Sequence, residues 1–277
     1  MSETANRISP TTDTPDIVVS VDAMGGDKGC PAVVAGMAKA AHTYPNIKFI
    51  VHGDQAQLAP LLAKRKNLSG KYEVRHAADV ITMDDKPSHA MRNGKNSSMW
   101  STVEAVKAKD ADAAVSCGNT GALMAISMLR LRKLPGVYRP AIAILWPSRN
   151  ASGFNVMLDV GADIRADAPD LLKYALMGAS YARNGFGLKR PRVGLLNVGT
   201  EEHKGRPELK EAHELISETF DGGDYEYVGF VEGNDIPSDT VAVIVTDGFT
   251  GNIALKTGER TANMFDTALR ERFKATI

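Results

Sequence analysis

Short apolar runs alternate with longer helical patterns along almost the whole chain. The runs are rich in Val and Ile and are apolar at consecutive positions, which is typical of strands that are buried on both faces. Strands that alternate with helices predict βαβ units and a mostly parallel sheet with helices on both of its faces. The expected strands are Ile17–Val21, Lys48–His52, Tyr72–Arg75, Ala113–Ser116, Ala141–Leu145, Val156–Val160, Val193–Asn197, Tyr227–Val231 and Val241–Thr246. The expected helices are Pro31–His42, Ala56–Lys66, Ser97–Lys109, Thr120–Lys133, Ala168–Asn184, Arg206–Phe220 and Asn252–Lys274.

This alternation predicts an α/β fold, a Rossmann-like three-layer α/β/α sandwich. Pro, Gly and Ser are scattered at the ends of the expected elements, and no linker rich in them separates two halves. We therefore expect a single α/β domain over residues 16–277. Residues 1–15 are polar and contain no apolar segment, so we expect a disordered N-terminal tail rather than a signal peptide.

The composition excludes several classes of protein. The 277 residues include 33 Lys and Arg against 33 Asp and Glu, and a net charge of zero argues against a dedicated nucleic-acid binder. The two cysteines, Cys30 and Cys117, lie neither in a CxxC pair nor beside a His cluster, so a disulfide framework or a zinc site is not expected. Reduced thiols, and the absence of any run of about 18 apolar residues, predict a cytoplasmic chain without a membrane span.

Five of the expected strands are followed by Gly together with Asp or Asn. Ligands bind beyond the carboxyl ends of the strands in a doubly wound sheet, so we expect these segments to gather at one edge. Each segment alone is a weak signal, because Gly, Asp and Asn also form ordinary turns. The five segments are Asp22–Asp27, Cys117–Ala122, Asp159–Asp163, Asn197–Gly205 and Thr246–Asn252.

Two of these segments open helices and predict an anion site. They are Gly118–Gly121 and Gly248–Asn252. Glycines let the backbone approach a ligand, and helix N-termini present free N–H groups and the positive end of the helix dipole. Neither segment matches the P-loop or the dinucleotide fingerprint, so neither nucleotide hydrolysis nor a nicotinamide cofactor is indicated. We expect phosphate to bind in the cleft formed by the two segments.

In their order and spacing, the motifs of this chain resemble those of the PlsX family of phosphate acyltransferases. The resemblance extends from Val18 to about Phe273. The matching stretches are DAMGGD at Asp22–Asp27, RNGKNSSM at Arg92–Met99, CGNTGALM at Cys117–Met124, RPA at Arg139–Ala141, LDVGAD at Leu158–Asp163, LLNVGTEEHKG at Leu195–Gly205, EGND at Glu232–Asp235 and DGFTGNIALK at Asp247–Lys256.

The resemblance implies a bacterial enzyme of phospholipid biosynthesis that makes acyl phosphate from fatty acyl-acyl carrier protein and inorganic phosphate. It also implies a homodimer without cofactor or metal, on a fold related to those of isocitrate and isopropylmalate dehydrogenases and of phosphotransacetylases. The acyl group would then pass to a membrane glycerol-phosphate acyltransferase. The chain departs from the family at Cys30, which is inserted, and at Asp163, where many members have Asn. It also ends at Ile277, short of the C-terminal helices and strand expected in the family.

The implied reaction needs groups that hold phosphate beside a thioester carbonyl and stabilise the oxyanion of the tetrahedral intermediate. Lysines can supply the charge, and asparagines can supply neutral donors. We expect catalytic roles for Lys204, Lys256, Asn119 and Asn234. The expected substrate-binding residues are Asp22, Gly25, Gly26, Asp27, Lys95, Gly118, Thr120, Gly121, Arg139, Asn197, Gly251 and Asn252.

Some of these candidates, and others near them, have simpler structural interpretations. Asp22 and Asp27 can serve only to cap turns in a strand-end loop. Cys117 is a tempting nucleophile, but no positioned base is visible, and a small residue at a strand end is the simpler interpretation. His203 suggests an acid–base role, whereas an exposed histidine in a charged loop explains it without chemistry.

Other functions fit the same motifs. A phosphotransacetylase-like enzyme would use acyl-CoA in place of the carrier protein. An oxidoreductase related to isocitrate dehydrogenase would share the fold, but the missing dinucleotide fingerprint counts against it. A non-catalytic scaffold of lipid synthesis would bind phosphate without turnover.

Two stretches predict contacts with partners. Residues 113–158 contain no Asp or Glu, and a basic surface there suits an acidic carrier protein unless its cations pair with acids elsewhere in the fold. Residues 260–277 read as an amphipathic helix that lies on an anionic membrane, or that packs on the core or on a dimer partner. The basic residues of the first stretch are Arg130, Arg132, Lys133, Arg139 and Arg149, and the apolar stripe of the second is Met264, Phe265, Leu269, Phe273 and Ile277.

Overall fold

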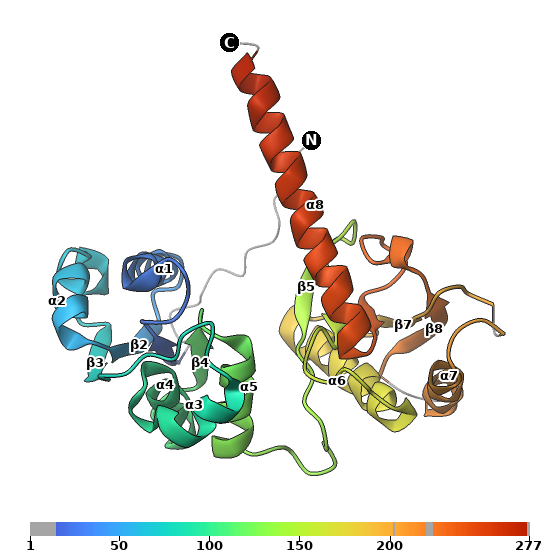
Figure 1. Ribbon diagram of the computed structural model, residues 1–277, viewed down its shortest axis with the longest axis horizontal. Coiled ribbons are helices and arrows are strands. Elements are labelled where there is room, and N and C mark those ends of the chain that lie inside the picture. Colours follow the sequence, from blue (N-terminus) through green and yellow to red (C-terminus); the bar gives the residue numbers. More distant parts are fainter. Residues whose placement is uncertain (1–14, 202, 220–223, 276–277) are drawn as a thin grey trace. The chain divides into compact units, whose positions relative to one another are not determined.

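The computed structural model describes residues 15–201, 203–219 and 224–275 of the chain. The chain forms two compact units that divide after Lys133 (Figure 1). The tail expected to be disordered lies outside the described residues, apart from Pro15.

The first unit is built on a parallel sheet with the strand order β3-β2-β1-β4. Val19 lies beside both Phe49 and Ala113 in this register, so the carboxyl ends of neighbouring strands share one edge. The strands are β1 (Ile17–Asp22), β2 (Ile47–Gly53), β3 (Tyr72–His76) and β4 (Ala113–Ser116). The helices are α1 (Gly29–Thr43), α2 (Gln55–Ala63), α3 (Pro87–Asn93), α4 (Ser98–Lys107) and α5 (Thr120–Arg130), with 3-10 turns at Lys66–Leu68 and Gly94–Asn96.

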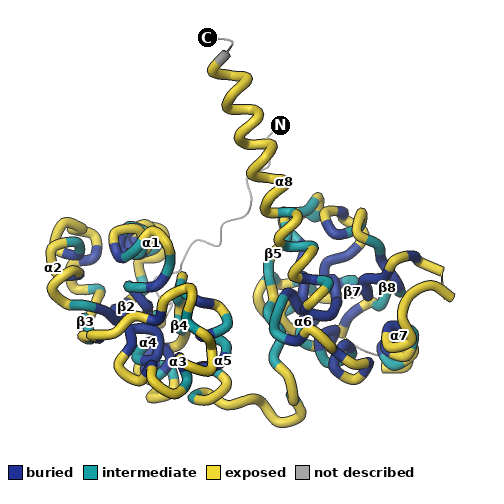
Figure 2. The backbone as a smooth tube through the Cα atoms, in the orientation of Figure 1, coloured by how far each residue is buried: buried dark blue, intermediate teal, exposed yellow. Residues whose placement is uncertain are grey.

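Helices cover both faces of this sheet because successive strand residues point to opposite sides. Val21 and Phe49 belong to the apolar cluster that packs against α1 and α2. Val18 and Ile50 face the other way and pack with α4. The central strands β1 and β2 are buried toward their carboxyl ends, whereas the edge strands β3 and β4 contain no buried residue (Figure 2).

The second unit is built on a mixed sheet with the strand order β5-β6-β9-β7-β8. β5 is antiparallel to β6, and the remaining neighbours are parallel. The strands are β5 (Ile144–Pro147), β6 (Phe154–Leu158), β7 (Arg192–Leu196), β8 (Glu226–Val231) and β9 (Val243–Val245). The helices are α6 (Ala168–Phe186), α7 (Pro207–Thr219) and α8 (Gly248–Ala275), with a 3-10 turn at Gly233–Asp235.

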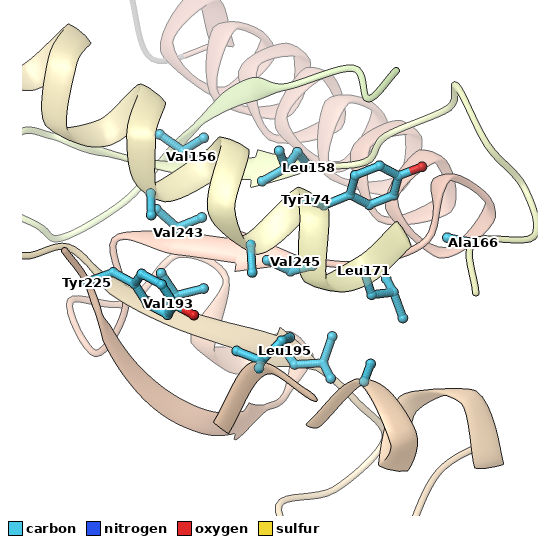
Figure 3. Close-up of a cluster of buried hydrophobic side chains, with 14 of the residues drawn as sticks. Val156, Leu158, Ala166, Leu171, Tyr174, Val193, Leu195, Tyr225, Val243 and Val245 are labelled. Atoms are coloured by element: carbon cyan, nitrogen blue, oxygen red, sulfur yellow. The ribbon is translucent and has the colours of Figure 1, made fainter. Parts of the chain in front are cut away.

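The helix α6 forms the centre of the larger core of this unit. Asp167 caps its N-terminus by accepting a backbone N–H of the first turn, and Gly187 ends it in a left-handed conformation. Figure 3 shows Tyr174 among the buried strand side chains that the helix covers. The helix approaches the sheet closely at Gly178, where a Cβ atom would lie 2.5 Å from the side chain of Val243.

The α/β class and the mostly parallel strands are confirmed, and each of the nine expected strands overlaps a strand of the described residues. The strands form two sheets, however, where the sequence predicts one. The strand expected at Ala141–Leu145 is found at Ile144–Pro147, as β5. Ile142 is not part of it, because its backbone bonds to the loop after β6: its carbonyl accepts the Val160 amide, and its amide donates to the Asp159 carboxylate. The helix α3 was missed because seven residues are too few to show a helical period.

The helix α8 differs along its length. Its first turns pack on the second sheet, where Ala254 and Leu255 belong to an apolar cluster with Trp146. From Glu259 to Lys274 every residue is exposed (Figure 2). Neither α8 nor any other helix in the described part of the chain is long and apolar enough to cross a membrane.

A buried histidine joins two strands of the first unit to α4. The His52 ring is bonded to the hydroxyls of Ser20 through Nε2 (2.8 Å) and of Ser101 through Nδ1 (2.7 Å). The Ser20 hydroxyl also contacts the carbonyl of Thr102 at 2.9 Å. Burial, helped by the charge of Arg75, lowers the pKa of His52 to about 4. The ring is therefore neutral in the folded chain at pH 7.

We predict that acidification destabilises the first unit through His52. Between pH 6.5 and about 4 the unfolded chain binds a proton at this ring and the folded chain does not, so stability falls as the pH falls. From pH 7 to pH 5 the loss should be about 2 kcal/mol, as measured by urea unfolding. His52→Asn should remove most of this pH dependence. An unchanged slope in that variant would contradict the assignment.

Candidate functional site

The loops that follow β1 and β4 are joined by the buried carboxylate of Asp22. The Ser116 hydroxyl donates to this carboxylate at 2.6 Å, and the amide of Met24 donates to it at 3.2 Å. The same hydroxyl accepts the amide N–H of Gly118 at 3.0 Å. Asp22 therefore positions two loops at the strand edge.

Glycines let these two loops touch backbone to backbone. A Cβ atom on Gly25 would lie 2.7 Å from the amide nitrogen of Gly118. Gly26 has a φ of +89°, and its Cβ atom would lie 2.8 Å from the carbonyl oxygen of Cys117. No other residue type fits either position without moving the neighbouring loop.

Asn119 is fully used by the fold. Its side-chain oxygen accepts the amide of Ala122 at 3.0 Å and so caps α5. Its side-chain nitrogen donates to three carbonyls of the loop before α3, at 2.9 to 3.3 Å. The polar atoms of Asn119 therefore anchor a helix and a loop. Within the described residues, no acceptor pairs with the N–H groups of Thr120 and Gly121 at this helix start.

A second buried carboxylate, Asp159, organises the loop after β6. It accepts the amides of Ile142, Gly161, Ala162 and Asp163 in five hydrogen bonds of 2.6 to 3.0 Å. The start of α8 passes directly over this group. A Cβ atom on Gly248 would lie 2.6 Å from the carboxylate. A Cβ atom on Gly251, a predicted binding residue, would lie 2.0 Å from the carbonyl oxygen of Asp159.

A carboxylate of the chain itself, that of Asp247, occupies the N-terminus of α8. Asp247 accepts both the amide and the hydroxyl of Thr250 at 2.9 Å, and it is paired with the guanidinium of Arg206. The amide of Gly251 bonds to the Asp247 carbonyl, and that of Gly248 to the Asp163 carbonyl. The amides expected to hold phosphate in this segment are thus largely occupied from within the chain. The two segments expected to form one phosphate cleft belong to different units.

The strand ends of β7, β8 and β9 surround a hollow of about 380 Å³ in the second unit. Asn197 lines it, and its side-chain nitrogen donates to the carbonyls of Gly199 and Lys204 at 3.0 and 3.2 Å. Arg206 also lines the hollow, with about half of its side chain exposed. A guanidinium is well suited to phosphate, but sequence reasoning missed Arg206. The sequence feature that could have indicated Arg206 is its position, directly between the NVGTEEHKG motif and the helix α7.

The remaining predicted residues are spread over the surface of their units. Lys204 is paired with Glu201 at 2.7 Å, which raises the pKa of the lysine, and Lys256 is paired with Glu259 at 2.9 Å. Asn252 donates to the carbonyl of Val160 at 3.2 Å. Exposed side chains are found at Asp27, Lys95 and Asn234.

Cys117 and His203 are both exposed. In the part of the chain that the structure describes, His, Cys, Asp and Glu side chains form no group that could hold a metal ion.

Comparison with known proteins places this geometry in a family. The model of the fatty acid synthesis protein family matches residues 17–277. A phosphate acyltransferase of Paracoccus denitrificans is 69% identical over 261 residues, which cover 94% of this chain and 70% of the relative. One from a Ruegeria species is 64% identical over 274 residues, with 99% and 73% covered.

The chain belongs to the phosphate acyltransferase family.

The fold is shared more widely. The phosphotransacetylase EutD of Staphylococcus aureus has a TM-score of 0.62 at 16% identity, over 90% of this chain and 83% of that one. A phosphotransacetylase of Streptococcus pyogenes has a TM-score of 0.64 at 17% identity, over 89% and 82%. The family, the enzyme class and the relation to the phosphotransacetylase fold, all expected from the sequence, are confirmed.

The structure explains how this phosphate acyltransferase accommodates Asp163. The guanidinium of Arg139 donates to Asp163 at 2.6 Å and lies 3.5 Å from Asp170. The amide of Arg165 donates to Asp163 at 3.1 Å. Arg139, a predicted substrate-binding residue, is therefore engaged with two carboxylates of its own unit.

We predict that Asp159→Asn destabilises the enzyme by about 3 kcal/mol or more, because one amide oxygen cannot replace the two carboxylate oxygens that accept four N–H donors, and some of these donors are left buried without a partner. Asp163→Asn is the matched control. It keeps an oxygen acceptor beside Arg139, and should cost about 1 kcal/mol. Urea unfolding of both variants measures the difference. Equal losses would show that the carboxylate of Asp159 does not organise the loop.

Proposed function

We propose that this chain transfers a fatty acyl group from an acyl carrier protein thioester to inorganic phosphate, in the synthesis of phospholipid. The observation that carries the proposal is the 69% identity with a phosphate acyltransferase over almost the whole chain. The strand-end loops support it, because they offer backbone N–H groups and cations and contain no nucleotide-binding motif.

The reaction requires no covalent intermediate on the enzyme. An oxygen of hydrogen phosphate attacks the thioester carbonyl carbon, and the carbonyl oxygen becomes an oxyanion that N–H donors stabilise. The tetrahedral intermediate then collapses with cleavage of the carbon–sulfur bond. The thiolate takes up the proton lost by hydrogen phosphate, which gives acyl phosphate and the free carrier thiol.

Phosphate is proposed to bind at the start of α5. The amides of Thr120 and Gly121 are free there, and the first turn of the helix contains no acidic residue. Thr120 is exposed, so an anion can reach these groups. The carboxylate of Asp247 accepts the amide of Thr250 at the start of α8, which favours the α5 position over the second predicted segment.

An assay of the purified chain with palmitoyl-acyl carrier protein and phosphate tests the function. We expect phosphate-dependent release of the carrier thiol, together with an acyl phosphate that hydroxylamine traps. Strong preference for palmitoyl-CoA would favour the phosphotransacetylase-like alternative. Binding of phosphate without turnover would favour the scaffold.

We predict that Thr120→Asp raises the KM for phosphate about tenfold or more, because a carboxylate at the first turn repels the anion. Stability should not fall, since acidic residues are favourable at a helix N-terminus. Thr120→Asn is the uncharged control and should keep a nearly normal KM. If both variants bind phosphate like the wild type, the anion is bound elsewhere.

Charge attraction is proposed to guide the acidic carrier protein to the enzyme. The basic surface expected over residues 113–158 is smaller than the sequence suggests, because some of its cations pair within the fold. Arg130 donates to Glu104 in two bonds of 2.6 and 2.7 Å and lies over the ring of Trp100. Arg139 is bound to Asp163. Arg132 of the first unit and Arg149 of the second unit are exposed.

The exposed half of α8 is proposed to meet an apolar partner, either a second copy in a homodimer or the cytoplasmic face of a membrane, where a glycerol-phosphate acyltransferase would use the product. Phe265 and Phe273 are 59% and 69% exposed, so the described stripe is not packed on the core of its own chain. Met264 and Leu269 complete the stripe, and Ile277 lies outside the described residues.

We predict that Phe265→Glu with Phe273→Glu abolishes whichever contact the stripe makes, because burying two carboxylates is unfavourable. Sedimentation velocity measures the dimer, and co-sedimentation with anionic and neutral liposomes measures membrane contact. Asn263→Glu with Thr267→Glu is the matched control, because it adds the same two charges outside the line of Phe265, Leu269 and Phe273, and it should change neither. A wild-type chain that is monomeric and ignores both kinds of liposome would refute the proposal.

A further inference from the structure

The first unit contains an apolar groove of about 540 Å³ between α1 and the sheet. The floor is formed by side chains of β1 and β4, which include Val19, Val21 and Val115. The wall is formed by small residues of α1, namely Ala32, Gly36 and Ala40.

The groove stays open for reasons that are visible in the fold. β4 is the edge strand of the sheet among the described residues, and Val115 is 47% exposed. Small residues of α1 leave room above this strand, and a Cβ atom built on Gly36 would meet nothing within 4 Å. The volume is within the range of about 300–1,000 Å³ that is usual for small-molecule sites.

One end of the groove reaches the strand-end loops. Gly25, Gly26 and Cys117 line that end, together with the charged pair of residues Asp27 and Lys28 that precedes α1. The groove then follows α1 from Lys28 to Ala40, a distance of about 18 Å along a helix. The site is thus long and apolar, and its polar groups lie at one end only.

We propose that the groove binds the hydrocarbon chain of the acyl substrate, with the thioester carbonyl at the end formed by Gly25, Gly26 and Cys117. The inference rests on the proposed function, which supplies a long apolar chain with one reactive polar end. It is supported by continuity with the proposed phosphate position, since Gly25 packs directly on Gly118 at the entrance to α5.

The test compares acyl donors of increasing chain length. In the wild type, the KM for the donor should fall about fourfold for each added methylene, equivalent to about 0.8 kcal/mol, until the groove is filled. Gly36→Leu places a side chain into the open space and should remove this gain for long chains. The variant should fold, because Leu has a higher helix propensity than Gly.

Gly185→Leu on α6 is the matched control, because it is the same exchange at an exposed helical glycine in the other unit. It should leave the chain-length profile intact. Normal long-chain kinetics in Gly36→Leu would overturn the proposal. The proposal would also be overturned if Gly36→Leu changed the oligomeric state and raised the KM for donors of every chain length equally. The groove would then be an interface between copies of the chain.

A binding measurement separates this proposal from the proposed function. A fluorescent long-chain fatty acid should bind the wild type and the Gly185→Leu variant, and should bind Gly36→Leu at least tenfold more weakly. If this pattern appears without any acyl transfer to phosphate, the groove stands and the proposed function fails. If transfer occurs and the fatty acid binds all three proteins equally, the function stands and the groove proposal fails.

Discussion

Two buried carboxylates hold the strand-end loops on which the rest of the site depends. Asp22 ties the loops after β1 and β4 together through Ser116, and Asp159 gathers four backbone amides around the loop after β6. Both groups are almost completely removed from water, and in the described part of the chain N–H and O–H donors satisfy their oxygens. Glycines at Gly25 and Gly251 are then required, because any side chain there would collide with the organised backbone.

Much of the fold could be predicted because strands buried on both faces are recognisable as continuous apolar runs. β1, β2 and β7 lie within about one residue of their expected bounds. The division into two sheets could not be seen, since the apolar pattern of a strand reports its burial and not which strand pairs with it. Ile142 illustrates a further limit. It looks like part of a strand, but its backbone bonds to Asp159, an interaction between residues that only the folded chain brings together.

The site was predicted less completely because polar residues in glycine-rich loops have two uses. Asn119 and Asp22 have the sequence context of ligand-binding groups, yet their polar atoms are taken up by a helix cap and by neighbouring loops. Arg206 was missed for the opposite reason, since an isolated cation before a helix has no distinctive pattern. Its position beside Asp247 depends on the juxtaposition of β7 and β9 in the sheet.

The exposed outer half of α8 receives no stabilisation from packing on the core of its unit. From Glu259 to Lys274 the helix is exposed on all sides, and within the described part of the chain it is held by its internal hydrogen bonds and by local ion pairs such as Arg270 with Asp266. Helices of this length are marginal in water without tertiary packing. The backbone amides of this segment should therefore exchange with solvent much faster than those of α6. Their protection would rise only when a partner covers the stripe, which makes the segment a local reporter of assembly.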